Sequence, residues 1–492
     1  MNSAAAGNSP VSDPHNPTGK KFFGHPRMLA NLFSVEMWER FSFYGMQGIM
    51  VYYLYYSVAD GGLGLPESSA TGIIGAYGSM VYLFAIVGGF FGDRVFGPER
   101  TLFYSALAIM AGHIALALLP GVAGVIIGMV LVAIGSGGLK TNASVLVGSL
   151  YSRTDPRRDA GFTIFYIGVN IGALLGPLLT GFAWKTLGFH FGFGLAAIGM
   201  AFGLIQYSLT RKNLPAEVHT ISDPLQGHEK RRYSIAAIAV LSIIALLLSL
   251  GVVTADNLSS WVMGLILLGA SALAYQLLTS QQTTETEHSR VIAFLPLWVG
   301  NAVFWALYQQ QFTVMAVYSD TRLDWNILGF EFPPSTINSI NPIFIILFGT
   351  VFSTMWTKLG DRQPPTPIKF ALGIIGVGIA FLIFLTQAGN PSVNVGWIVL
   401  ILFVYSIAEL TISPVGFSLA TKLAPEAHRS NMMAFYFTSV SMGTVLSGWL
   451  AQFYSEETEV AYFSILGVGT IVIGIILWFF NGWILQRMKG IH

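Results

Sequence analysis

The sequence predicts an all-α polytopic membrane protein: two six-helix halves with an extra helix pair inserted between them. Three observations support this fold class, namely the composition, the length of the apolar segments and a repeat of landmark residues. Hydrophobic residues make up 53% of the 492 positions, and charged residues only 10%. Because soluble domains carry about 25% charged residues, we expect the bilayer to be the solvent for most of this chain.

The apolar segments supply the helices, since crossing a bilayer takes about 20 helical residues. Fourteen segments meet this criterion, at 31–57, 71–92, 101–119, 122–149, 160–185, 190–210, 234–253, 258–279, 291–319, 337–357, 368–387, 396–421, 430–454 and 460–486. They define an N-terminal six-helix bundle over 29–212, a cytoplasmic linker with the inserted helix pair over 213–285, and a C-terminal six-helix bundle with a short cytoplasmic tail over 286–492. Residues 1–28 are polar and proline-containing, so we expect a disordered cytoplasmic tail.

The basic residues predict the orientation, because cytoplasmic loops are enriched in Lys and Arg. With the N-terminus inside, all but four of the 25 Lys and Arg residues fall on the cytoplasmic side. The exceptions are Arg40, Lys140, Lys185 and Arg322, and only Arg322 lies in a predicted outer loop. We therefore expect a multi-pass protein of the cell's inner (plasma) membrane with both termini cytoplasmic.

Composition also narrows the class of function. The net charge of +1 argues against a nucleic-acid partner. Without cysteine, the chain can form no disulfide, thiolate metal site or cysteine nucleophile. The predicted helices also carry no metal cluster and no nucleophile–base pair, so we do not expect an enzyme.

The two halves share landmark residues. Gly-Asp-Arg occurs after the second segment, at 92–94, and again after the tenth, at 360–362. Lys140 follows the first of these aspartates by 47 residues, and Glu409 follows the second by 48. Two repeated halves that rock around a midplane site are the architecture of a major-facilitator transporter.

Charged side chains inside the predicted spans are the candidate functional residues, because each costs about 3 kcal/mol at the bilayer centre. They are Glu36, Glu39, Arg40, Lys140 and Glu409. The first three share one helical face, and Glu409 has no basic partner in its own half. One interpretation is a set of packing ion pairs without a transport role. We favour the other, a proton and substrate site in which Glu409 faces a central cavity near Lys140.

Several motifs resemble one transporter family. Residues 36–45, with their Glu-x-x-Glu-Arg pattern, are similar to the first-helix signature of proton-coupled oligopeptide transporters, the peptide-transporting branch of the major facilitators. Segments 88–94 and 165–174 resemble that family's signatures in the second-to-third and fifth helices. Shorter motifs at 137–140, 304–307, 341–342 and 409–414 also fit. The resemblance covers roughly residues 25–486, and the inserted helix pair matches bacterial members.

The resemblance implies a proton-coupled symporter that imports di- and tripeptides by alternating access. It implies proton coupling by Glu36, Glu39, Arg40, Lys140 and Glu409. It further implies that Lys140 orients the peptide carboxylate and that Glu409 orients the amino terminus. The implied substrate-binding set is Tyr44, Gln47, Tyr82, Lys140, Asn170, Trp305, Gln309, Asn341, Glu409, Ser413 and Tyr436.

Departures from the family pattern concern the outer gate. Gln47 and Gln309 stand where many members carry Arg and Glu, and we expect a Gln–Gln hydrogen bond to close the same gate. Phe43 replaces a frequent Tyr. The expected partners are di- and tripeptides, protons and membrane lipids, with no cofactor besides the coupling proton and with a functional monomer. The alternative is a related proton-coupled carrier for a non-peptide solute, such as nitrate, a drug or a metabolite.

Overall fold

The computed structural model describes residues 21–152, residue 155 and residues 157–491. Most of the predicted disordered tail, residues 1–20, lies outside the described residues, as does Arg153. Residues 21–28 differ from the predicted disorder, because β1 (Lys21–Phe22) and β2 (His25–Pro26) form an antiparallel hairpin. His25 Nδ1 lies 2.9 Å from the Tyr151 hydroxyl, and this contact ties the hairpin to the loop that follows the fourth helix.

Six long helices form the N-terminal half. They are α1 (Arg27–Tyr55), α2 (Glu67–Phe91), α3 (Pro98–Leu118), α4 (Gly121–Ser149), α5 (Arg158–Leu187) and α6 (Phe189–Thr210). A π-helical turn, η2 (Gly92–Phe96), extends α2 before α3 begins. Proline at the first position of α3 suits a helix start, and Gly97 supplies the positive φ of +83° that this corner requires.

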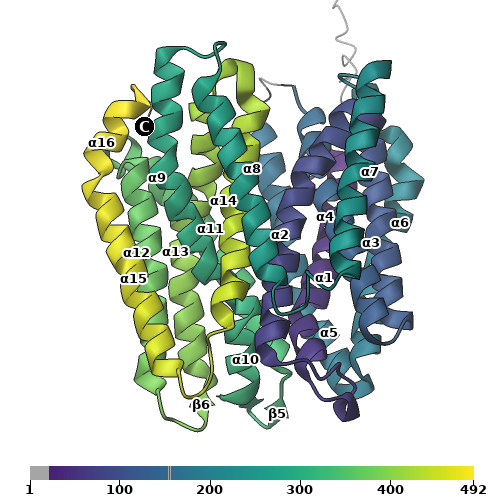
Figure 1. The fold of residues 1–492 in the computed structure, drawn as a ribbon, viewed down its shortest axis with the longest axis vertical. Coiled ribbons are helices and arrows are strands. Elements are labelled where there is room, and N and C mark those ends of the chain that lie inside the picture. Colours follow the sequence, from purple (N-terminus) through teal and green to yellow (C-terminus); the bar gives the residue numbers. More distant parts are fainter. Residues whose placement is uncertain (1–20, 153–154, 156, 492) are drawn as a thin grey trace, which may run out of the picture.

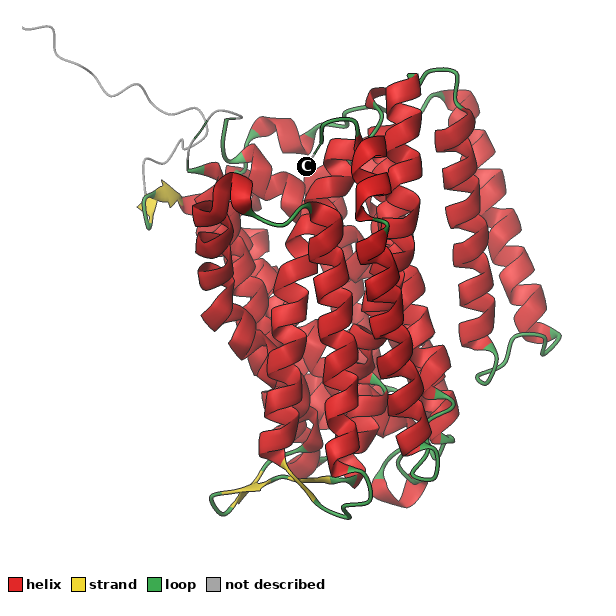
Figure 2. Cartoon of the chain, turned by 90° about the vertical axis from the view of Figure 1, so that its left-hand side faces the viewer, coloured by secondary structure: helices red, strands yellow, loops and turns green. Residues whose placement is uncertain are grey.

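Two further helices, α7 (Gly227–Ser249) and α8 (Leu258–Thr279), stand at the side of the bundle (Figure 2). No residue of α7 is buried, whereas α8 packs on α2 and on a helix of the C-terminal half. Ser69 at the start of α2 hydrogen-bonds Asp256 in the turn between the pair. The pair therefore packs on the bundle mainly through α8. The start of α7 also touches it, because Arg94 Nη2 lies 3.0 Å from Glu229 Oε2 and the Tyr233 ring packs on Phe90.

The C-terminal half contains eight helices in the described chain. They are α9 (Glu285–Tyr308), α10 (Val314–Thr321), α11 (Ile337–Leu359), α12 (Thr366–Phe384), α13 (Val395–Leu423), α14 (Arg429–Ala451), α15 (Glu459–Phe479) and α16 (Asn481–Met488). A capping box starts α9: Thr284 N donates to Glu287 Oε2 at 2.8 Å, and Glu287 N donates back to Thr284 Oγ1.

One crossing of this half is broken where the sequence predicts a continuous helix over 291–319. A 3₁₀ turn, η5 (Gln309–Phe312), separates α9 from α10. The break follows from Thr313, whose φ of −123° and ψ of −99° lie outside the helical region. The interruption brings three consecutive glutamines, residues 309–311, into the protein interior.

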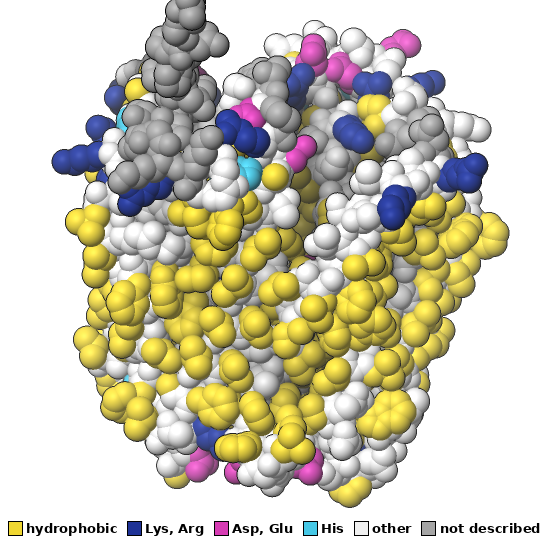
Figure 3. Space-filling model, turned by 180° about the vertical axis from the view of Figure 1, so that it is seen from behind, with side chains coloured by type: hydrophobic (Ala, Val, Ile, Leu, Met, Phe, Trp, Pro, Cys, Tyr) yellow, Lys and Arg dark blue, Asp and Glu magenta, His cyan; other side chains and the backbone are white. Residues whose placement is uncertain are grey.

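The two ends of the bundle differ. One end of the bundle carries the C-terminus and is here called the C-terminal end. It is reached by α7, α9 and α14 (Figure 1). At the opposite end, here called the strand end, β3 (Leu323–Asp324) pairs parallel with β6 (Val393–Asn394), and β4 (Asn326–Ile327) pairs antiparallel with β5 (Phe330–Glu331). Lys and Arg gather at the C-terminal end, beyond a broad apolar band at mid-depth (Figure 3).

Twelve helical segments of the described chain are long and apolar enough to cross a membrane. Two long helices, α1 and α14, are not among them. Most of their residues are nevertheless buried, so their polar side chains face other helices rather than lipid. α1 carries the charged face at 36–40, and α14 carries several Ser and Thr. With these two, the fourteen predicted segments each correspond to helix in the structure, and the predicted fold class is confirmed.

The halves meet most closely where α2 crosses α14. A Cβ added at Gly75 would lie 2.6 Å from Gly448 Cα, so only glycine fits on either side of this contact. One helical turn further along α2, the hydroxyls of Ser79 and Ser441 are 2.8 Å apart. α5 and α11 form the second contact between the halves. A cavity lies between these two contacts.

Candidate functional site

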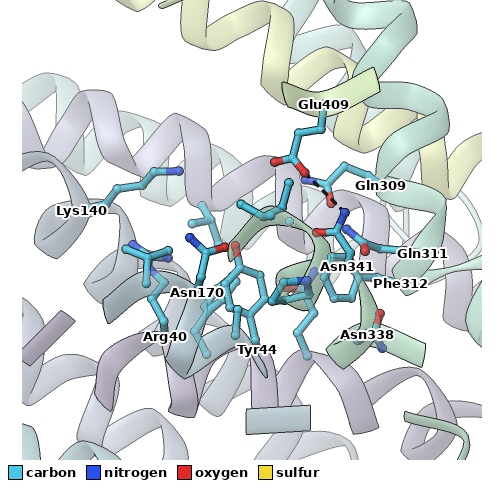
Figure 4. A pocket seen from close by; sticks show the side chains of 18 of the residues that line it. Arg40, Tyr44, Lys140, Asn170, Gln309, Gln311, Phe312, Asn338, Asn341 and Glu409 are labelled. Atoms are coloured by element: carbon cyan, nitrogen blue, oxygen red, sulfur yellow. Dashed lines mark hydrogen bonds between the residues drawn. The ribbon is translucent and has the colours of Figure 1, made fainter. Parts of the chain in front are cut away.

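A cavity of about 300 Å³ lies between the halves. Its walls come from α1, α2, α4 and α5 on one side and from α9, η5, α11 and α13 on the other. Figure 4 shows Arg40 and Lys140 on the first side and Glu409 and Asn341 across from them. The volume is at the low end of the range for small-molecule sites, about 300–1,000 Å³.

A buried charge cluster forms part of the first wall. Arg40 Nε lies 2.8 Å from Glu36 Oε1 and 3.1 Å from Glu39 Oε2. Ser136 on α4 donates to Glu39 Oε1 at 2.8 Å. Glu36 and Arg40 line the cavity, whereas Glu39 is fully buried behind them. Two carboxylates share one guanidinium, so the cluster keeps a net negative charge unless one carboxyl group holds a proton.

Lys140 belongs to the same wall but not to the ion pairs. Its Nζ lies 4.3 Å from the centroid of the Tyr82 ring, a cation–π contact. Among the described residues it has no carboxylate within ion-pair distance, although the resemblance implies that it acts in proton coupling together with the glutamates of α1. The Lys140 ammonium therefore faces the cavity without a direct ion pair among the described residues.

The opposite wall holds a hydrogen-bonded network around Glu409. Tyr308 donates to Glu409 Oε2 at 2.6 Å, and Asn341 Nδ2 lies 3.4 Å from the same oxygen. Asn341 also donates to Ser406 Oγ at 2.9 Å. Glu409 has no basic partner within ion-pair distance in the described chain. The expected position of Glu409 in the cavity is thus observed, but it makes no ion pair with Lys140.

The strand end of the cavity is closed by contacts between the halves. Tyr55 and Tyr56 donate to the two oxygens of Asp320, at 2.5 and 2.8 Å. Tyr52 donates to the Ala316 carbonyl at 3.1 Å. Nearby, Ser335 donates to the carbonyl of Pro177 in α5 at 3.0 Å.

The C-terminal end of the cavity is open. Ser144 and Tyr166 line this side, and Tyr166 is 50% exposed. Figure 3 shows the surface hollowed between the halves at this end. The hydrogen bonds and ion pairs found between α1–α6 and α9–α16 in the described chain lie at mid-depth or at the strand end. The geometry is that of a carrier whose central site faces one side only.

Comparison with known proteins identifies the family of this chain. The model of the POT family matches residues 99–469. The chain belongs to the POT family. It is 38% identical to a "Di-/tripeptide transporter" of Lactococcus lactis subsp. cremoris, over 97% of this chain and 99% of that protein. It is 41% identical to the "Uncharacterized transporter YclF" of Bacillus subtilis (strain 168), over 96% and 97% of the two chains.

A solved POT-family structure shares the fold in detail. A mutant of a "peptide transporter POT", crystallised in complex with alafosfalin, is 43% identical with a TM-score of 0.92. The alignment covers 97% of this chain and 98% of that one. The family resemblance drawn from the motifs is therefore confirmed.

Most residues that the POT-family motifs imply come together at the cavity. Its lining includes Glu36, Arg40, Tyr44, Gln47, Tyr82, Lys140, Asn170, Trp305, Gln309, Asn341 and Glu409. Ser413 and Tyr436 are not part of the lining. The buried Ser413 Oγ has no hydrogen-bond partner, and Tyr436 packs against Phe417. Ser413 lies one helical turn beyond Glu409 in α13, and Tyr436 lies on α14. The roles of both residues stay predictions.

The expected Gln47–Gln309 hydrogen bond is absent from the described chain. Gln309 Nε2 instead donates to Thr444 Oγ1 in α14, at 3.4 Å. Gln47 lies beside α2, near the backbone of Gly78. The prediction of a Gln–Gln gate is wrong for this conformation, because the break at η5 directs Gln309 toward α14. The tyrosine–aspartate contacts close the strand end instead.

Several site residues were not found from the sequence, and four of them matter most here. Tyr308 binds Glu409, Ser136 binds Glu39, and Tyr166 and Asn338 line the cavity. Asn338 is only 5% exposed, and neither polar atom of its side chain has a protein partner. The sequence held a signal for two of them. Asn338 lies one helical turn before Asn341, and Tyr308 directly follows the motif at 304–307. No group of His, Asp and Glu that could hold a metal ion was found among the described residues.

Proposed function

We propose that this protein is a proton-coupled symporter that imports di- and tripeptides by alternating access. The observation that carries the proposal is one cavity with an ammonium group on one wall and a carboxyl group on the other, neither of them in an ion pair among the described residues. Among the residues that the structure describes, Lys140 supplies a cation without an ion-pair partner, and Glu409 supplies a carboxyl group without one. A short peptide carries the complementary charges at its two ends.

Peptide binding follows from this arrangement. The peptide carboxylate would lie toward Lys140 and Arg40, and its ammonium group toward Glu409. Contacts to terminal and backbone groups are common to all short peptides, so they give affinity without sequence preference. Aromatic side chains such as Tyr44 and Trp305 provide apolar surface for varied peptide side chains.

Proton coupling is assigned to the carboxyl groups of the same site. One carboxyl of Glu36 and Glu39 can hold a proton while the other pairs with Arg40, and Glu409 can do so opposite them. A proton that moves down a membrane potential of 100 mV releases about 2.3 kcal/mol. This free energy is sufficient to bias the exchange between cavity conformations, and no cofactor is needed beyond the coupling ion.

The orientation is inferred from charge. Lys and Arg gather at the C-terminal end (Figure 3), and we assign that end to the cytoplasm of a bacterial inner membrane. Lys185 pairs with Glu331 at the strand end, at 2.7 Å, so Arg322 is not the only basic residue on the outer side. With this orientation the conformation is inward-facing. A single chain holds the complete cavity, which supports a functional monomer.

Uptake of labelled dialanine into proteoliposomes tests the proposal. We expect accumulation only with an inward proton gradient, and we expect excess unlabelled di- and tripeptides to abolish it. A proton-independent leak with no peptide competition would contradict the symport mechanism. Competition by a non-peptide solute, but not by peptides, would favour the alternative carrier function.

A further inference from the structure

A second cavity, remote from the central one, lies at the C-terminal end of the C-terminal half. Its volume is about 710 Å³, and it is enclosed by the end of α11, the start of α12 and the last turns of α13. Two lysines line it, Lys369 and Lys422, and no acidic residue is among its lining residues in the described chain. We propose that this cavity binds a phosphate group, carried by an anionic membrane lipid or free in solution.

The lysine at its centre is unusually placed. Lys369 is only 7% exposed, and a buried ammonium needs a counter-charge or several hydrogen bonds. Its Nζ donates to Gln363 Oε1 at 2.6 Å and lies 4.4 Å from the Trp356 ring centroid. Among the described side chains, which do not include that of Asp361, no carboxylate lies within ion-pair distance of it. The described side chains thus leave the positive charge of Lys369 without a counter-charge.

Further donors face the same space. Lys422 lines the cavity and is exposed at its mouth. Trp356 also lines it, and its buried indole Nε1 has no hydrogen-bond partner. Thr366 and Ser418, which carry hydroxyl groups, also line the cavity. Two ammonium groups, an indole N–H and two hydroxyls match the acceptor-rich surface of a phosphate.

The pseudo-symmetric position in the N-terminal half shows that such a corner can be occupied. There, Thr101 stands at the spacing after Asp93 that Lys369 has after Asp361. The linker crosses that corner, since Asp223 N donates to the Asp93 carbonyl at 3.1 Å. In the C-terminal half, the equivalent corner is left as a cavity, and its lysine replaces a neutral residue.

The position favours a lipid as the source of the phosphate. The cavity lies where three helices end at the membrane surface, and exposed apolar side chains of α11 and α13 adjoin it, including Met355, Leu359 and Phe417. Basic pockets between helices on the cytoplasmic side are known to hold lipid head groups. A head group in the cavity would place its acyl chains along this apolar surface.

Native mass spectrometry of the full-length protein tests the inference. We expect the wild type to retain one more phosphatidylglycerol than phosphatidylcholine, and K369Q/K422Q to weaken phosphatidylglycerol binding by roughly tenfold or more. K230Q/R231Q is the matched control, because it removes two positive charges from exposed positions of α7 at the same end. We expect the control to retain the lipid as the wild type does.

Further arms separate the outcomes. Inorganic phosphate, titrated at millimolar concentration, should displace the lipid in the wild type alone if the site recognises phosphate itself. Phosphate binding without lipid retention would keep the phosphate site and assign its occupant to solution. Equal retention of both lipids, or equal loss in the control, would overturn the proposal. If the double variant does not fold, K422Q alone serves, because Lys422 is exposed.

Discussion

Tyr308 and Glu409 are joined by a hydrogen bond of 2.6 Å from the phenol to the carboxylate oxygen Oε2. The same hydroxyl lies 3.1 Å from Asn341 Oδ1. A phenol has a single proton, so the shorter contact to Glu409 determines its direction. This bond links the break in the α9–α10 crossing to the carboxylate proposed to bind the peptide ammonium group.

Y308F should therefore impair peptide binding. The substitution removes one of the two hydrogen bonds that position Glu409, and hydrogen bonds to charged groups contribute about 1.5–3 kcal/mol. We expect the KM for dialanine uptake to rise about tenfold. Y405F is the matched control, because Tyr405 stacks on Tyr308 but donates to the Leu307 carbonyl outside the cavity. An equal rise in both variants would indicate general loss of packing.

E39Q should separate coupling from binding. The variant removes one of two carboxylates that share Arg40, while Lys140 and Glu409 remain in place. We expect uptake driven by a pH gradient to be lost and peptide counterflow to persist at least in part. If both activities fall together in folded protein, Glu39 has another role than proton coupling.

D155N is the control for that experiment. Asp155 lies in the loop between α4 and α5, where hydrogen bonds from the Arg157 side chain and backbone lower the pKa of its carboxyl to about 2. The group stays ionised throughout the physiological range, and its pairing is lost only as the pH falls toward that value. The pH profile of uptake by D155N should therefore match the wild type.

D320N should weaken closure at the strand end. The Asp320 carboxylate accepts hydrogen bonds from Tyr55 and Tyr56 across the halves, one at each oxygen. The amide of Asn has only one oxygen that can accept, so one of these bonds is lost. The chain has no cysteine, so a single Q311C reports access to the cavity. We expect faster labelling by an impermeant maleimide added at the strand end.

E331Q is the control for the contacts of Tyr55 and Tyr56 with Asp320. It breaks the Lys185–Glu331 pair, which also joins the halves, but Glu331 is exposed and such pairs contribute little. Labelling of Q311C should change little in E331Q. Similar acceleration in both variants would show that closure depends on surface charge rather than on the tyrosine contacts.

G448A should disrupt the crossing of α2 and α14. A Cβ there would lie 2.6 Å from the Thr71 carbonyl oxygen and 2.7 Å from Gly75 Cα, so the helices must separate. We expect at least a tenfold lower uptake rate with normal expression. G469A is the control, because an added Cβ at Gly469 meets no atom within 4 Å; a comparable defect there would point to helix propensity instead.

Much of the fold could be predicted from the sequence because each helix crosses the bilayer on its own apolar residues. The exceptions are instructive. The interruption at η5 escaped prediction, since no proline marks it and the run of glutamines reads as part of an apolar segment. Tyr308 and Ser136 were not predicted because their roles depend on neighbours about 100 residues away in the chain. A neutral phenol or hydroxyl group in an apolar segment also gives no sign in the sequence that it binds a buried carboxylate.

By itself, the sequence determined the membrane class, the number of crossings, the repeated halves and the identity of most polar residues that line the cavity. These follow from local hydropathy and from motifs that lie within single helices. Only the tertiary structure decided which side of the cavity is closed, which residues close it, and that Lys140 and Glu409 face each other without pairing. Those features arise between helices distant in the chain, where packing directs each side chain.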